Sequence, residues 1–414
     1  MANPTVADKE SVKETTLKLL AYCRAHDWAG FDPYDALNSR VFRAFPFLNF
    51  KLVRLVLTQA VKRCPINLRP LLLVPRTPNP KGIALFLSSI TRLQKIGLIE
   101  KDNLLSLTAD KLLSLRSVHQ RRSCWGYNFD WQTRTYLVPK GSPNIICSTF
   151  AANGLLDAFE YLHDPVYLDA AMGTADFILE TLFWREGPSK ACFSYTPLER
   201  TEIHNANLLG AAFLCRVGRM TGQQRYIEPA LEAARFSVTR QHKDGAWAYG
   251  ETAHQGWIDN FHTGYNLTAL RRIRDYSGTA EFDDAILRGF DFYRTHFFRE
   301  DGAAKYYHNA TYPIDIHSIA QSILTLVEFE DFGGDNRNLA YSVLNWAIAN
   351  MWDARGYFCF QKLPHYKVRT PFMRWSEAWM LLALTTLIEE WPQPEKPTCG
   401  NSGESKRLKA NIPK

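Results

Sequence analysis

Acidic residues are missing from a long N-terminal part of this 414-residue chain. Residues 36–99 contain no Asp or Glu but include eleven Lys and Arg residues, although the whole chain carries a net charge of only +7. This basic block predicts contact either with the anionic inner face of a membrane or with the protein's own acidic surface. The block is rich in leucine and has no nucleic-acid-binding motif, so nucleic acid is not an expected partner.

Long apolar runs and paired cysteines are missing as well. No window of 18 uninterrupted apolar residues occurs, so the sequence predicts no transmembrane helix. The N-terminus has acidic residues where a signal peptide needs positive charge. The eight cysteines are scattered, with no CxxC and no Cys/His spacing of a zinc site. We therefore expect a cytoplasmic protein with reduced cysteines and no bound metal.

Nucleotide-binding signatures are also missing. The chain contains neither GxGxxG nor GxxxxGK[ST], which argues against a Rossmann dehydrogenase and a P-loop enzyme. The DxDD acid motif of terpene cyclases, which also have helical toroids, does not occur. We expect no cofactor.

An internal repeat is what the sequence does contain. Five runs with helical periodicity begin at polar residues spaced 61, 55, 55 and 59 residues apart, namely Asn144, Asn205, Asn260, Asp315 and Arg374. A short aromatic segment precedes each run, and a second amphipathic run separates each from the next. We interpret the repeat as helical hairpins in which the first helix, rich in small residues, lies inside.

The repeat predicts an all-α fold, an (α/α) toroid of about six hairpins with short aromatic loops or strands at its mouth. An open superhelix would have shorter repeats and fewer aromatic loops. We expect one domain over residues 1–391. Within it, the less regular, basic residues 1–120 complete the ring with helical stretches at 11–27, 50–64, 82–97 and 107–120. A disordered basic tail is expected over residues 392–414.

A functional site is expected at the mouth, where the inner helices begin and their backbone N–H groups converge. Asn and Asp at helix starts are usually caps. Here, however, four successive helix starts combine His, Asp, Asn or Arg, where Ser or Thr would satisfy capping. The catalytic candidates are Asp259, His262, Tyr265, Asp315, His317 and Glu377. Aromatic rings, amides and cations suit sugar rings and their hydroxyls, and the substrate-binding candidates are Trp125, Trp131, His204, Asn205, Trp247, Tyr249, Tyr306, Tyr307, Gln321, His365, Lys367, Arg374 and Trp375.

Three kinds of chemistry fit these groups. Hydrolysis needs two carboxylates, to which Asp32 and Asp35 would contribute if the segment GFDPYDAL folds over the mouth. Proton abstraction beside a uronic-acid carboxylate, in an epimerase or lyase, needs a Tyr, His or Lys base and an Arg or amide clamp. Glycan binding without catalysis would use the same groups. The sequence leaves all three open, and mouth geometry should distinguish them.

Several segments carry a resemblance to a known family, most specifically IDNFHTGYN and PIDIH, together with CWGYNFDWQ and TPFMRWSEAWM. The chain resembles six-hairpin toroid proteins of bacterial exopolysaccharide and capsule biosynthesis, which are related to six-hairpin glycosidases. It is more distantly similar to uronyl epimerases and polysaccharide lyases. The resemblance implies a protein that modifies or cleaves an oligosaccharide or lipid-linked glycan. The alternative is a non-catalytic glycan-binding or scaffold subunit of the assembly machinery.

Overall fold

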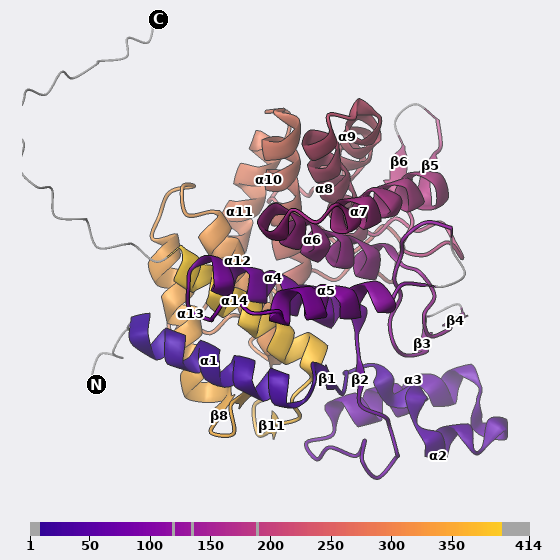
Figure 1. Ribbon diagram of the computed structural model, residues 1–414, viewed down its shortest axis with the longest axis vertical. Coiled ribbons are helices and arrows are strands. Elements are labelled where there is room, and N and C mark those ends of the chain that lie inside the picture. Colours follow the sequence, from indigo (N-terminus) through magenta and orange to yellow (C-terminus); the bar gives the residue numbers. More distant parts are fainter. Residues whose placement is uncertain (1–8, 118–120, 134–135, 188–189, 391–414) are drawn as a thin grey trace, which may run out of the picture.

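Six inner helices form a closed ring in the computed structural model, which describes residues 9–117, 121–133, 136–187 and 190–390. Each inner helix packs on the next, and the last packs on the first (Figure 1). They are α4 (Pro80–Lys95), α6 (Ile145–Leu162), α8 (His204–Thr221), α10 (Asn260–Ser277), α12 (Ile316–Glu328) and α14 (Ala378–Glu389).

Outer helices surround this ring, and each packs mainly against one inner helix. α5 (Leu104–Ser114), α7 (Pro165–Phe177), α9 (Gln224–Val238), α11 (Asp283–Phe297) and α13 (Asn336–Met351) pack on the inner helix that precedes them. α1 (Lys9–Ala25) packs on α14, so the two ends of the described chain form the sixth hairpin. The predicted (α/α) toroid is confirmed.

Small residues and polar caps explain why these helices pack and where they begin. A Cβ at Gly154 in α6 would lie 2.9 Å from the Ala84 carbonyl oxygen of α4, so only glycine allows this close approach. The side chains of Asn79, Asn144 and Asp259 accept backbone N–H bonds at the starts of α4, α6 and α10. Residues at or just before the starts of all six inner helices line one cavity, so these helices begin together at one end of the ring.

Short strands sit between the helices, and two of the five repeated aromatic segments, those around Phe193 and Tyr357, contain strands. The antiparallel pairs are β1 (Ala29–Gly30) with β2 (Thr77–Pro78), β3 (Trp131–Gln132) with β4 (Leu137–Val138), β5 (Phe183–Arg185) with β6 (Ala191–Phe193), and β8 (Trp352–Asp353) with β9 (Tyr357–Phe358). A three-stranded sheet has the order β11 (Lys367–Val368), β10 (Gln361–Lys362), β7 (Ile314–Asp315).

The N-terminal part departs from expectation in one respect. The prediction that residues 50–64 supply a ring helix was wrong, because α3 (Lys51–Arg63) packs on η1 (Asp35–Asn38) and β3 beside the ring. Among its residues only Val61 is buried, whereas α4 buries most of its length. α2 (Arg40–Arg43) and η2 (Pro46–Leu48) accompany α3 in this excursion (Figure 1).

Two other sequence expectations concern the C-terminal tail and transmembrane helices. The predicted disordered tail, residues 392–414, lies outside the described residues. Among the helices of the described ranges, none is long and apolar enough to cross a membrane.

Candidate functional site

An aromatic cavity of about 460 Å³ opens where the inner helices begin, and we call it the mouth cavity. Tyr249 and Trp257 stack in its wall with ring centres 4.5 Å apart and planes inclined by 14°. Flat, stacked rings of this kind offer the apolar faces against which the C–H faces of a sugar pack. The other aromatic lining residues are Tyr34, Tyr127, Phe129, Trp131, Tyr195, Phe261, Tyr265, Tyr306, Tyr307 and Trp375.

A carboxylate–histidine pair lies at the start of α10. The buried Asp259 carboxylate accepts the backbone N–H of His262 at 3.0 Å and contacts Nδ1 of the same ring at 2.7 Å. Trp257 Nε1 donates a third bond to Asp259, at 3.0 Å. When the ring is neutral and its Nδ1–H donates to Asp259, the lone pair lies on the other ring nitrogen, Nε2. His262 lines the cavity, and the part of the chain that the structure describes gives Nε2 no hydrogen-bond partner.

A second histidine, His317, lies deeper in the same cavity. Its Nε2 is 2.6 Å from the Tyr265 hydroxyl oxygen, and its ring is stacked between Phe261 and Trp379, with centres 4.6 Å from each. Burial, reinforced by the positive charges of Lys81 and Arg374, holds the pKa of His317 well below its usual value. The imidazole is therefore neutral near pH 7.

Lys81, in the first turn of α4, is a cavity residue that the sequence analysis missed. Its Nζ lies 4.2 Å from the centre of the Phe150 ring and 5.0 Å from that of Trp379, and no described carboxylate forms an ion pair with it. Burial, with the nearby Arg374 charge, lowers the pKa of Lys81 well below its ordinary value. A lysine directly after the Asn79-Pro80 helix start and ahead of an apolar run was the available signal.

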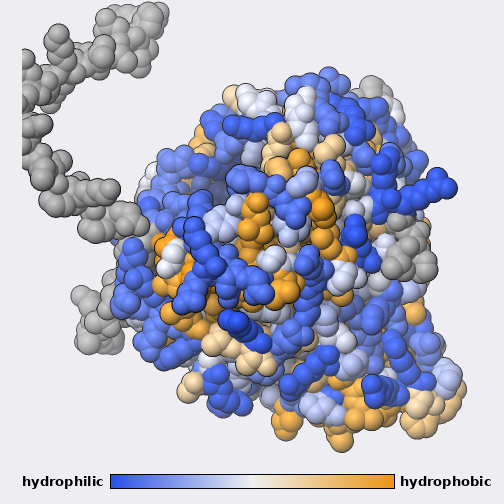
Figure 2. Space-filling model, in the orientation of Figure 1, coloured by the Kyte–Doolittle hydropathy of each residue, from blue (hydrophilic) through white to orange (hydrophobic). Residues whose placement is uncertain are grey.

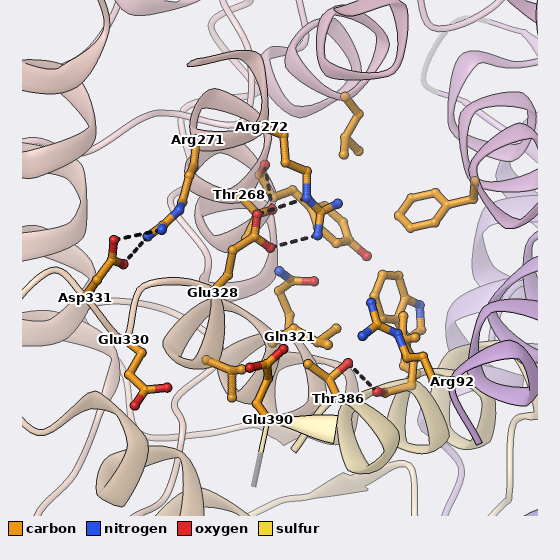
Figure 3. A pocket seen from close by; sticks show the side chains of 17 residues that line it. Arg92, Thr268, Arg271, Arg272, Gln321, Glu328, Glu330, Asp331, Thr386 and Glu390 are labelled. Carbon is orange, nitrogen blue, oxygen red and sulfur yellow. Dashed lines mark hydrogen bonds and ion pairs between the residues drawn. The ribbon is translucent and has the colours of Figure 1, made fainter. Parts of the chain in front are cut away.

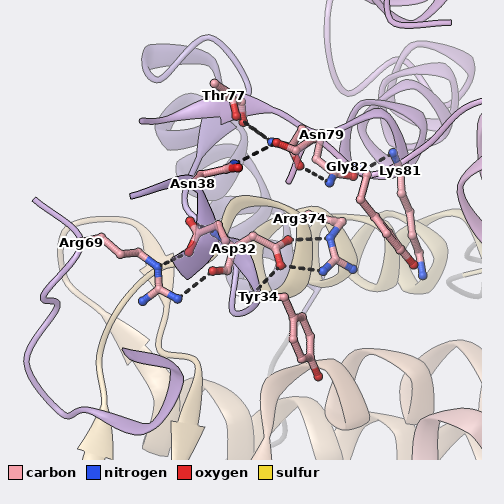
Figure 4. Close-up of polar contacts among 12 residues, drawn as sticks. Asp32, Tyr34, Asn38, Arg69, Thr77, Asn79, Lys81, Gly82 and Arg374 are labelled. Carbon is pink, nitrogen blue, oxygen red and sulfur yellow. Dashed lines mark hydrogen bonds and ion pairs between the residues drawn. The ribbon is translucent and has the colours of Figure 1, made fainter. Parts of the chain in front are cut away.

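Arg374 reaches the cavity while its charge is balanced from behind. Its Nε and Nη2 donate to the two carboxylate oxygens of Asp32 at 2.6 and 2.8 Å, and both side chains are almost fully buried (Figure 4). Asp35 is held similarly by Arg69, with Nε at 2.6 Å. The segment GFDPYDAL thus does fold against the mouth. It contributes the Tyr34 ring to the cavity wall, while its two aspartates bind arginines.

The structure brings about half of the predicted site residues to the cavity wall. These are Trp131, Asn205, Tyr249, His262, Tyr265, Tyr306, Tyr307, His317, Arg374 and Trp375, with Asp259 directly behind His262. Their roles stay predictions, but their proximity is a property of the fold.

Two predicted carboxylates lie outside the cavity. Asp315 is fully buried, and its oxygens accept bonds from Gln361 Nε2 at 2.6 Å and Trp375 Nε1 at 2.9 Å. Glu377 is buried and accepts the Phe358 backbone N–H at 3.0 Å. No Asp or Glu of the described residues lines the mouth cavity. Hydrolysis by two flanking carboxylates therefore finds no support in its wall.

The remaining predicted residues have other surroundings. The indole N–H groups of Trp125 and Trp247 donate to backbone carbonyls in the core, and His204 lies between Ser237 and Glu251. His365 is exposed, and Lys367 Nζ donates to the carbonyl of Asn350. None of these five lines the mouth cavity.

Gln321 lines a second cavity, of about 700 Å³, where the inner helices end (Figure 3). The charges there are paired: Arg271 with Asp331 at 2.6 Å and Arg272 with Glu328 at 2.7 Å. Tyr265 borders both cavities. We place the candidate site in the smaller mouth cavity because titratable side chains there lack described partners: Nε2 of His262 has no hydrogen-bond partner and Lys81 has no ion pair.

Replacing Glu377 with Gln should change how stability depends on pH. Burial raises the pKa of Glu377 well above its ordinary value of 4.5, so the folded state keeps a proton that the unfolded chain loses above pH 4.5. This contribution is fully present below pH 4.5 and is lost as pH rises toward the folded-state pKa. In urea unfolding, the free energy of unfolding of E377Q should equal that of wild type at about pH 4. Above pH 4 the variant should be the more stable protein, and the difference should grow by up to about 1.4 kcal/mol per pH unit. A constant difference between the two proteins would contradict this account.

Comparison with known proteins agrees with the architecture. No protein-family model and no curated protein matches the chain. Solved structures do match. Cellobiose 2-epimerase from Bacillus thermoamylovorans shares 10% identity over 77% of this chain and 90% of its own, with a TM-score of 0.59. A possible member of glycoside hydrolase family 105 from Salmonella enterica shares 11% over 94% and 97%, with a TM-score of 0.58. An unsaturated glucuronyl hydrolase specific for heparin shares 11% over 92% and 96%, with a TM-score of 0.56. The chain thus has the (α/α) toroid fold of six-hairpin carbohydrate-processing enzymes.

Proposed function

We propose that this protein is a carbohydrate-active enzyme that moves a proton at a sugar carbon next to a carbonyl group, as an epimerase or lyase does. One observation carries the proposal. The mouth cavity presents a histidine held by a buried aspartate, His262 with Asp259, and no described carboxylate lines its wall. A general base of this kind suits proton abstraction, whereas glycoside hydrolysis needs carboxylates on both sides of the bond.

The pair supplies the base. Nε2 of His262 accepts the proton from carbon, and the Asp259 carboxylate stabilises the imidazolium that forms. For an epimerase, a proton must return on the opposite face of the same carbon. The Tyr265 hydroxyl, which contacts Nε2 of the neutral His317, is the described cavity group suited to donate that proton. The tyrosinate then regains a proton from solvent as the His262 imidazolium releases one.

Negative charge on the carbonyl oxygen must also be stabilised in the transition state. Arg374 uses Nε and Nη2 for Asp32, which leaves the N–H groups of Nη1 for a ligand in the cavity. Asn205 also lines the cavity, and its buried Oδ1 has no protein partner. Arg374 is therefore the candidate clamp for the sugar's carbonyl or carboxylate group, and Asn205 Oδ1 is a candidate acceptor for a sugar hydroxyl.

The biological setting is the less direct part of the proposal. The sequence resemblance supports action on a bacterial surface polysaccharide, or on its oligosaccharide or lipid-linked precursor, from the cytoplasmic side. Binding of the same glycan without turnover remains the alternative. The cavity's aromatic wall would serve both.

Solvent deuterium distinguishes these functions. The purified protein should be incubated in D₂O with reducing disaccharides and with uronate-containing oligosaccharides, and the products read by mass spectrometry and NMR. We expect either an epimerised product with deuterium at the carbon beside the carbonyl group, or, for a lyase, an unsaturated product. Release of new reducing ends with neither carbon-bound deuterium nor unsaturation would instead identify a hydrolase, and glycan binding without any product would favour the binding protein.

A further inference from the structure

We infer that the excursion formed by residues 40–73 is a docking surface for an anionic lipid bilayer. This interfacial segment contains α2, η2, α3 and the loop that follows, and the six hairpins of the ring are complete without it. It projects from the body of the protein at the lower right of Figure 1. Its position frees it to meet another surface.

Exposed apolar side chains are concentrated in the interfacial segment. Of the eighteen large hydrophobic residues exposed in the described chain, nine fall within residues 41–73. Leu71 is 77% exposed, Phe47 75% and Ile66 70%, more than any exposed hydrophobic residue elsewhere in those ranges. Figure 2 shows orange gathering along the lower edge, where Figure 1 places α2 and α3. Apolar rings and chains this exposed are typical of surfaces that enter a bilayer interface or contact a partner.

The charge around this apolar surface is positive, which favours an anionic bilayer as its partner. The segment has no acidic residue. Its Arg40, Lys51 and Arg63 are exposed, and no described carboxylate pairs with their side chains. Cations flanking exposed aromatic and aliphatic groups match a layer of lipid phosphates above acyl chains. A second copy of the same surface would oppose cation to cation, which disfavours self-association through it.

The same segment forms part of the mouth cavity. On α3, Leu55, Thr58 and Gln59 line the cavity, while Leu52 and Val56 on a neighbouring face are exposed. A bilayer bound by the segment would therefore lie beside the opening of the site. This further step rests on the proposed function: the substrate would be a glycan whose lipid anchor stays in the membrane while its sugar enters the cavity.

Vesicle co-sedimentation of the full chain tests the docking surface without any assay of turnover. Vesicles of phosphatidylcholine alone should be compared with vesicles that also contain phosphatidylglycerol. We expect salt-sensitive binding to the second kind only. Replacing Arg40, Lys51 and Arg63 together with Gln should weaken it by about 100-fold, since each cation near the surface contributes about fivefold. F47S/L71S should weaken it by about tenfold or more.

Matched variants separate this inference from its alternatives. L107S/L287S removes two leucines that are each 56% exposed outside the segment, and it should bind like wild type. H262Q should also bind like wild type, so failed chemistry and failed docking are distinguishable. Binding that is equal on neutral vesicles, or unchanged in F47S/L71S, would overturn the inference. So would a dimer in solution that F47S/L71S converts to monomer, because the surface would then be covered by a second copy.

Discussion

Replacing His262 with Gln should lower kcat by about 10²- to 10⁴-fold, the usual contribution of a positioned general base. The substitution removes the Nε2 lone pair that faces the cavity but keeps a polar side chain able to bond Asp259. The loss should appear in kcat more than in KM, because the proton is transferred only in the transition state. The measurement is the initial rate of deuterium incorporation into a responsive sugar under saturating conditions.

Two companion variants give this result its meaning. His308 lies just outside the cavity wall and contacts the carbonyl of Ile258, so H308Q should retain wild-type turnover. D259N keeps the volume of the carboxyl group but cannot stabilise an imidazolium, so it should lose much of the rate with its fold intact. An active H262Q protein would exclude His262 as the base and move the search to Lys81 and His317.

Replacing Arg374 with Met should destabilise the folded protein by about 3–5 kcal/mol. The variant leaves the Asp32 carboxylate, which is 3% exposed, buried without the arginine that pairs with it. Replacing both residues, as D32L/R374M, removes the stranded charge and should recover a large part of the loss. Urea unfolding followed by circular dichroism measures both effects, with R288M as a control. Arg288 pairs with Asp284 on the surface of α11, and its loss should cost less than about 1 kcal/mol.

The double variant makes the test specific. If D32L/R374M were as unstable as R374M, the loss would come from missing side-chain packing and not from an unpaired charge. If R374M matched the surface control, the two buried side chains would not be held together as described. Either result would also weaken the assignment of Arg374 as a clamp in the mouth cavity.

The ring could be predicted because its causes are local and repeated. Small residues on one run, an amphipathic second run and polar helix starts recur at near-constant spacing. Each repeat therefore forms the same kind of hairpin and packs against its neighbours in the same way. The N-terminal helices lack that repetition. α1 and α3 have similar patterns, and which of them completes the ring depends on packing against α14, far away in the sequence.

The site could be predicted only as a region, for two physical reasons. First, the partners that occupy a side chain are distant: Asp315 is bound by Gln361 and Trp375, which no spacing within its own repeat reveals. Second, η4 (Met373–Glu377) is a π-helical turn, so the ordinary helical period misplaces its residues. Arg374 and Trp375 reach the cavity, whereas Glu377 does not.

Closure of the ring through α1 and α14 has a consequence for how the protein is made. The Phe31 carbonyl accepts the Met373 backbone N–H, and Asp32 binds Arg374 across 342 residues of sequence. At about 5–20 residues per second on the ribosome, roughly 20 to 70 s separate the emergence of these two partners. During that time α1 has no inner helix to pack on, and the aromatic wall of the mouth is incomplete. A ribosome that stalls shortly before η4 would therefore hold a chain whose mouth lacks Trp375 and lies open to chaperones and proteases.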